Sequence, residues 1–244
     1  MKNDTRKLFK EKIRAAGIHL AISFLVFLGI FFVILFEWYP EPFFSAEGGW
    51  DGIKLMAAVD LVLGPSLTLI IYNYTKARKE IVFDLSLVVA VQISALIWGG
   101  FQVYSERPVA LVMWEGIFYT VTEDYYQKQG ISLKDIATFS KDRPLIIYAE
   151  TDHSVEQLKE IKRLNEEKIP PYAQVHLYHS VKENLNKVLS HQLLDEQLLI
   201  NLQYTNLHND VETELFAFLG RAKYKTLSIT LNAEGELVGI ALAQ

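Results

Sequence analysis

Two aspartates lie inside stretches of the chain that are otherwise apolar. Asp60 precedes a Gly64-Pro65 pair, and Asp84 lies in the next apolar stretch. Both features are costly in hydrocarbon, because a carboxylate loses its water there and a proline removes a helical hydrogen bond. Acids at this depth indicate either proton-sharing chemistry between two carboxyls or recognition of another helix.

The spacing of the two acids argues against a catalytic pair. Two carboxyls that share a proton lie about 3 Å apart. With the rise of a helix, Asp60 lies about 10 Å below one membrane face and Asp84 about 5 Å inside the other, which leaves about 15 Å between them. We therefore reject an intramembrane aspartyl protease. Asp84 is expected instead to reach a nearby basic group: Arg78, Lys79, Arg14 or His19.

The neighbours of Asp60 favour helix recognition as much as a structural role. Asp60, Gly64 and Thr68 are four residues apart and share one helical face. Pro65 predicts a kink at the same place, and Gln92 lies near mid-membrane in the following stretch. Small residues on such faces let helices approach closely. The candidate partner-binding residues are Asp60, Gly64, Pro65, Thr68, Asp84 and Gln92.

Signatures of catalysis, metal binding or cofactor binding are scarce. The chain has no cysteine and no phosphate-binding loop, nucleophile elbow or zinc-protease motif. His176 and His179 fall on a predicted strand, where residues three apart point in opposite directions. The remaining soluble-domain histidines are predicted at the surface: His153, His191 and His208. No catalytic residue, metal or cofactor is therefore predicted.

Three apolar stretches are long enough to cross a bilayer. They cover residues 18–36, 53–72 and 81–103, and about 20 helical residues span the hydrocarbon core. The first stretch is predicted to be an anchor rather than a cleaved signal peptide. Phe44-Ser45-Ala46, which follows it, places a bulky residue where a cleavage site needs a small one.

The basic residues predict the orientation of the spans. Six of them lie in residues 1–17 and three in the loop 73–80, whereas the loop 37–52 and the residues just after it carry only Lys54. Basic residues concentrate on the cytoplasmic side. The tail is therefore predicted in the cytoplasm, and the region after the third span in the periplasm, with the inner membrane between them.

Residues 105–244 read as a soluble domain with 14 basic against 20 acidic residues. This acidic balance argues against nucleic acid as a partner.

Arg107-Pro108 is taken as a structural motif where the chain leaves the membrane. The predicted strands are 109–121, 144–149, 173–178, 215–219 and a terminal hairpin, 224–231 with 236–242. Helices are predicted to begin at Ser154, with Gln157 as its capping partner, and at Ser180, followed by a short helix through Leu199.

The predicted fold class is therefore a membrane protein with three N-terminal transmembrane helices, followed by a mixed α+β periplasmic domain that ends in a β-hairpin. Its parts are a basic cytoplasmic tail (1–17), a three-helix transmembrane region (18–104) and the periplasmic domain (105–244).

Several motifs at matching spacing resemble the type IV pilin accessory proteins of the TfpX/TfpZ group. They are residues 16–20, AGIHL; 38–40, WYP; 59–69, VDLVLGPSLTL; 83–85, FDL, followed by Gln92, Ala95 and Gly99; and 107–109, RPV. The likeness is strong over residues 15–120 and mostly architectural beyond them.

The resemblance implies a non-enzymatic inner-membrane protein that works with a cognate type IV major pilin in pilus assembly or retraction. The small-residue stripes and intramembrane carboxylates predict that the protein docks the pilin's transmembrane helix within membrane lipids, while its periplasmic domain touches the pilin's head domain. Asp84 lies at about the depth expected for the pilin amine. Two alternatives are a membrane enzyme that modifies or processes pilin or a lipid-linked precursor, and a periplasmic ligand sensor. The short tail argues against a sensor, because it leaves little room for a cytoplasmic output module.

Overall fold

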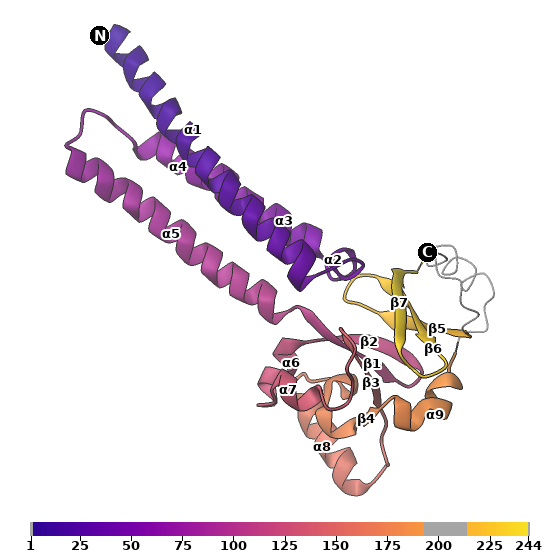
Figure 1. Cartoon of the computed structure of the whole chain (residues 1–244). Helices are drawn as coiled ribbons and strands as arrows, with labels where there is room; N and C mark the ends of the chain where they lie inside the picture. The colour runs from indigo at the N-terminus through magenta and orange to yellow at the C-terminus, as the bar shows by residue number, and fades with distance from the viewer. Residues whose placement is uncertain (1, 193–213, 244) are drawn as a thin grey trace. The chain divides into compact units, whose positions relative to one another are not determined.

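A computed structural model of the chain describes residues 2–192 and 214–243 (Figure 1). Its contacts divide the chain into two units. One comprises Met1–Pro40 and Gly49–Tyr104, and the other comprises Glu41–Gly48 and Ser105–Gln244. The helix predicted through Leu199 and the surface position predicted for His208 lie outside the described residues.

The first unit, called the membrane unit below, contains three helical stretches long and apolar enough to span a membrane: Thr5–Trp38, Gly49–Ile71 and Arg78–Ser105. They confirm the three predicted spans and extend beyond them. Their elements are α1 (Lys2–Val33), η1 (Ile34–Trp38), α3 (Gly49–Ala57), η2 (Ala58–Leu63), α4 (Gly64–Ile71) and α5 (Arg78–Ser105).

The middle span is irregular just before its proline. Residues 58–63 form the π-helical turn η2, and α4 begins at Gly64 with Pro65 in its first turn. Pro65 has no N–H to donate to the carbonyl of Leu61, so the regular helical ladder cannot continue through this point. The wider π turn is a usual response to such a defect and is frequent at functional sites.

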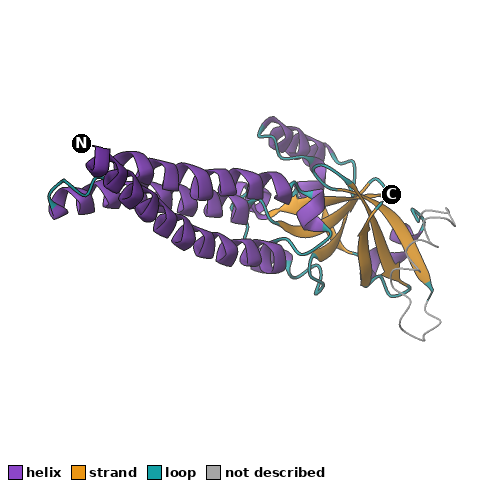
Figure 2. Cartoon of the chain, turned by 90° about the horizontal axis from the view of Figure 1, so that it is seen from above, coloured by secondary structure: helices purple, strands orange, loops and turns teal. Residues whose placement is uncertain are grey.

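Polar and aromatic contacts tie α5 to the end of the first span. The Tyr39 hydroxyl donates to the Val103 carbonyl at 2.8 Å, and the Trp38 and Tyr104 rings meet edge to face with centroids 5.1 Å apart. At the opposite end, Lys12 Nζ donates to the Ile70 carbonyl at 2.9 Å. This bond satisfies one of the unpaired carbonyls that end α4. Figure 2 shows the helices of this unit running side by side.

The second unit, called the sheet unit below, is built on one seven-stranded mixed sheet. Its order is β4-β3-β1-β2-β5-β6-β7, in which β1 pairs parallel with β3 and β2 parallel with β5, while the other pairs are antiparallel. This arrangement confirms the mixed α+β class and the terminal hairpin. The strands are β1 (Pro108–Trp114), β2 (Ile117–Thr122), β3 (Leu145–Ala149), β4 (Tyr178–Ser180), β5 (Leu215–Arg221), β6 (Thr226–Asn232) and β7 (Leu237–Leu242).

Strand β1 lies inside the sheet, between β3 and β2, and its middle residues are buried on both faces. Leu111 and Met113 point into one hydrophobic core, whereas Ala110 and Val112 point into the other. This alternation follows from the two-residue period of a strand, and a continuous apolar run is what a strand covered on both faces requires. The turn Glu115-Gly116 joins β1 to β2 with both residues at positive φ, as a type I′ hairpin requires.

Helices contribute to both cores. Tyr126 of α6, Ile136 of α7 and Leu164 of α8 pack in the core with Ala110, and Val188 of α9 packs in the core with Leu111. The helix predicted at Ser154 is confirmed as α8, and the Ser154 hydroxyl accepts from the Gln157 amide. The helical elements are α2 (Phe43–Ala46), α6 (Glu123–Lys128), α7 (Leu133–Ile136), α8 (Val155–Glu166), η3 (Pro171–Ala173), η4 (Val175–Leu177), η5 (Lys182–Asn184) and α9 (Leu185–Leu189).

The strand predicted over residues 173–178 is wrong for most of its length. The segment forms the short helical turns η3 and η4, and β4 begins only at Tyr178. The fully buried Gln174 explains the turns. Its side-chain amide donates to the Ile169 carbonyl at 2.9 Å, and this bond favours helical turns over an extended strand. His176 and His179 consequently do not share a strand.

The segment 41–48, which joins the first two spans in sequence, packs into the sheet unit. Phe43 and Ala46 belong to the core that contains Leu111, and Phe44 is fully buried. The Ala46 carbonyl accepts from the Tyr224 amide at 3.0 Å. The sequence alone predicts this segment within the transmembrane region, because local composition cannot show which distant residues cover Phe43 and Phe44.

Replacing Phe44 tests this packing. Phe44→Ala removes a fully buried ring and is expected to destabilise the sheet unit by about 3–5 kcal/mol. Thermal unfolding of the full chain in detergent micelles measures the change. Val155→Ala, which truncates an exposed side chain, is expected to change stability by less than about 0.5 kcal/mol. Equal stabilities of the two variants would contradict the packing.

The carboxyl of Glu47 predicts a pH dependence. Burial raises its pKa above the ordinary 4.5, despite opposing bonds from the Thr120 hydroxyl and the Lys223 amide. A raised pKa means that the folded state holds the proton to higher pH, so stability falls as the pH rises from 4.5 through the folded-state pKa. Unfolding midpoints between pH 4 and 7 should show this fall, and Glu47→Gln should reduce it. A steeper fall in the variant would refute this assignment.

Candidate functional site

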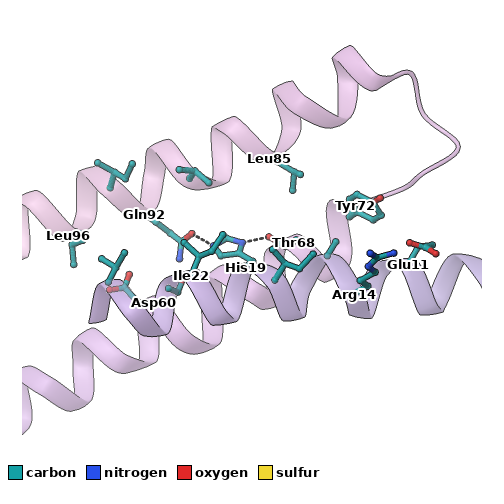
Figure 3. A pocket seen from close by; sticks show the side chains of 16 residues that line it. Glu11, Arg14, His19, Ile22, Asp60, Thr68, Tyr72, Leu85, Gln92 and Leu96 are labelled. Atoms are coloured by element: carbon teal, nitrogen blue, oxygen red, sulfur yellow. Dashed lines mark hydrogen bonds between the residues drawn. The ribbon is translucent and has the colours of Figure 1, made fainter. Parts of the chain in front are cut away.

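His19 joins all three helical stretches of the membrane unit through its two ring nitrogens. Nδ1 lies 2.5 Å from the Thr68 hydroxyl of α4, and Nε2 lies 2.7 Å from Gln92 Oε1 of α5 (Figure 3). The amide oxygen of Gln92 can only accept, so Nε2 carries a proton and donates to it, while Nδ1 bonds to the Thr68 hydroxyl. We call these three residues the polar bridge.

Gly64 makes the polar bridge possible. A Cβ at this position would lie 1.9 Å from Gln92 Nε2, closer than any contact allows. The absence of a side chain therefore lets the Gln92 amide pass beside α4 and reach His19. This is the role that small residues play where transmembrane helices approach closely.

Asp60 is a buried carboxyl of the middle span that lines the same space as the polar bridge. Its side chain belongs to η2 and is 6% exposed, and its Oδ2 atom has no hydrogen-bond partner among the described residues. A buried carboxyl without a partner is expensive, and more so in hydrocarbon than in a soluble core. The structure therefore leaves one polar group of the middle span unsatisfied.

A cavity of about 590 Å³ opens at these residues. Asp60 and all three residues of the polar bridge line it, and the rest of its wall is mainly apolar (Figure 3). The lining residues are Glu11, Arg14, Ala15, Ile18, His19, Ile22, Ser23 and Val26 from α1, Asp60, Thr68 and Tyr72 from the middle span and its end, and Leu85, Val89, Gln92, Ile93 and Leu96 from α5. We call this space the membrane cavity.

Asp84 is not part of the membrane cavity. Its carboxylate pairs with Lys76 Nζ at 2.6 Å, a partner that sequence analysis did not consider. The expected pairing with Arg78, Lys79, Arg14 or His19 is wrong, because the loop before α5 brings Lys76 back over the helix start and His19 is engaged elsewhere. The suggested contact between Asp84 and a partner's amine would require this ion pair to open.

The remaining predicted residues lie apart from the cavity. Pro65 is buried at the start of α4 but does not line the cavity, whereas Gly64 acts through Gln92. In the sheet unit, Arg107 forms an ion pair with Glu123, and Pro108 begins β1. The predicted membrane-exit motif therefore anchors the first strand to α6.

The role of His19 was missed at the sequence level, where it was considered only as a boundary cation. A usable signal was present. His19, Thr68 and Gln92 are three hydrogen-bonding residues in three separate apolar stretches, and such residues pair across helices in membranes. No group of three or more metal-ligating side chains occurs within residues 2–192 and 214–243.

Comparison with known proteins relates the chain to fimbrial assembly proteins. The family model described as "Fimbrial assembly protein FimB" matches residues 7–48, which run from α1 through α2 and include His19. Three curated proteins of Dichelobacter nodosus are similar over 110 residues, or 45% of this chain. No solved structure matches.

These relatives differ in how much of their length is matched. The fimbrial assembly protein of serogroup E1 is 41% identical over 42% of its length, and that of serogroup I is 39% identical over 42%. The one of serogroups C1 and C2 is 39% identical over 82% of its length. The chain thus spans less than half of two relatives and most of the third.

Gly64→Ala tests the polar bridge. Its methyl group would displace Gln92 and break the bond to His19, with an expected loss of about 1 kcal/mol or more in the stability of the membrane unit. Gly99→Ala is the matched control, because nothing lies within 4 Å of a Cβ there and alanine favours a helix. Unfolding of both variants in micelles should show a loss only for Gly64→Ala. A Gly64→Ala protein as stable as its control would argue against the bridge.

Proposed function

Because this chain belongs to the family of fimbrial assembly proteins, we propose that it is a membrane-anchored accessory protein of type IV pilus assembly that binds a cognate major pilin. In this proposal it assists or modulates assembly or retraction of the fibre without catalysing a reaction. The support is of two kinds: the names of its relatives, and a cavity in the membrane unit.

The observation that carries the proposal is the membrane cavity with its unsatisfied Asp60. A helix bundle that only anchored a domain would gain stability by closing such a space. An apolar cavity with few polar groups is the usual form of a binding site. A subunit held in the membrane by an apolar helix is a fitting partner for it.

The orientation proposed for the protein places its sheet unit where pilin heads are found. Nine basic residues flank the ends of the spans on one side, and this side is proposed to be the cytoplasm. The sheet unit then lies in the periplasm of a bacterial inner-membrane protein and contacts the soluble head of the pilin. The spans and the sheet unit thereby engage two parts of one partner.

Co-purification of the full chain with pilin tests the proposal. The tagged protein, extracted from membranes in mild detergent, is expected to enrich the major pilin over a tagged three-span protein of unrelated sequence. Cells that lack the protein should lose or alter their surface pili, and the full chain should restore them.

A mass measurement in the same cells separates binding from catalysis. The intact mass of the pilin should be identical with and without the protein, because a binding factor leaves its partner covalently unchanged. A pilin mass that depends on the protein would favour a modifying enzyme, and failure to enrich pilin would refute the proposed partner.

A further inference from the structure

We infer that one face of an apolar transmembrane helix of the partner packs into the membrane cavity and that Asp60 accepts a hydrogen bond from a donor group on that helix. This inference rests on the proposed function and specifies the chemistry of the contact. The donor is a hydroxyl, a side-chain amide or an ammonium group, since each of these can donate to a carboxyl oxygen.

The shape of the membrane cavity fits a rod. Its residues on α1 recur at steps of three and four from Glu11 to Val26, and those on α5 do the same from Leu85 to Leu96. Each set therefore forms a stripe along one helical face. The α1 stripe covers 15 steps, or about 22 Å at the rise of a helix. The space is an elongated groove with α1 as one wall, α5 as another and the middle span contributing Asp60 and Thr68 (Figure 3).

The small lining residues favour a helix over a flexible chain. Ala15 and Ser23 lie on the α1 stripe two turns apart, with Ile18, His19 and Ile22 between them. Small residues spaced along a groove let a neighbouring backbone approach closely, as in the small-residue interfaces of transmembrane helices. The apolar side chains between them supply the packing contact.

Asp60 identifies what the incoming helix must carry. The other polar groups beside it, His19, Thr68 and Gln92, are already hydrogen-bonded to one another. Asp60 is more than nine-tenths buried, lines the cavity and has an oxygen without a partner among the described residues. A lipid acyl chain in the groove would leave this carboxyl unsatisfied, because it has no donor. A helix with one donor at this depth satisfies it.

Photo-cross-linking from two valines of α5 tests the position of the helix. Val89 lines the cavity, whereas Val91 is two residues away at nearly the same depth, 59% exposed and outside the cavity. A photoreactive residue at position 89 of the full chain is expected to capture the major pilin in cells, and the same residue at 91 is not. Equal capture from both positions, or capture of lipid alone from 89, would overturn the inference.

Substitutions of Asp60 test the hydrogen bond. Asp60→Leu removes the acceptor while filling a similar volume, and capture from position 89 should fall roughly threefold to twentyfold, the range of interhelical hydrogen bonds in membranes. Asp51→Asn, at an exposed carboxylate on α3, should leave capture unchanged. Full capture by Asp60→Leu would refute the assignment of Asp60.

The variant Asp60→Asn identifies the donor. It keeps an acceptor oxygen without the charge, so it is expected to retain capture with a hydroxyl or amide donor and to lose capture with an ammonium donor. The unfolding midpoint of each variant confirms that the membrane unit is intact. Pilin that co-purifies but is not captured from position 89 overturns this inference alone, whereas pilin that does not co-purify also overturns the proposed function.

Discussion

The hydrocarbon core of a membrane offers no water, so every polar side chain within it must find its partner in protein. This constraint explains how the membrane unit is arranged around the bond between His19 and Gln92. That bond, together with the bond from His19 to Thr68, links three helical stretches, and it depends on Gly64 for room. Asp60 breaks the same rule. His19, Thr68 and Gln92 bond to one another, whereas the Asp60 Oδ2 atom has no hydrogen-bond partner among the described residues, and this contrast is the basis for proposing a donor on a partner helix.

The sheet unit follows a different rule: a strand that is buried on both faces must be apolar at every position. Strand β1 is apolar at consecutive positions because both cores need it, and the cores are completed by segments distant in sequence. The segment 41–48 is the farthest of these, since it contributes Phe43 and Ala46 to a core otherwise made from residues after 105. Burial of Glu47, in the same segment, raises the pKa of its carboxyl. The stability of the sheet unit therefore depends on residues that precede the second span.

Sequence analysis predicted those features that depend on local composition. The three spans, the strand at Leu145–Ala149, the helix after Ser154 and the terminal hairpin were each visible in a short window of residues. The errors involved partners distant in sequence or side chains that compete with the backbone. Gln174 turned a predicted strand into helical turns, and Lys76 rather than the expected groups paired with Asp84. Of the candidate site, Asp60, Gly64, Thr68 and Gln92 come together, yet His19, which connects Thr68 to Gln92, was missed because these partners are 49 and 73 residues away.

The packing of segment 41–48 also has a consequence for the order in which the protein can fold. Ribosomes make this segment early, but Tyr224, which bonds to it, and the strand β6 that shares its core are made near the end of the chain. Until β6 is made, Phe43 and the adjacent Phe44 lack part of their native cover, and β6 follows them by more than a hundred residues. We expect the sheet unit to fold cooperatively only after β6 has been translated. Until then segment 41–48 is exposed, and chaperones on its side of the membrane can bind it.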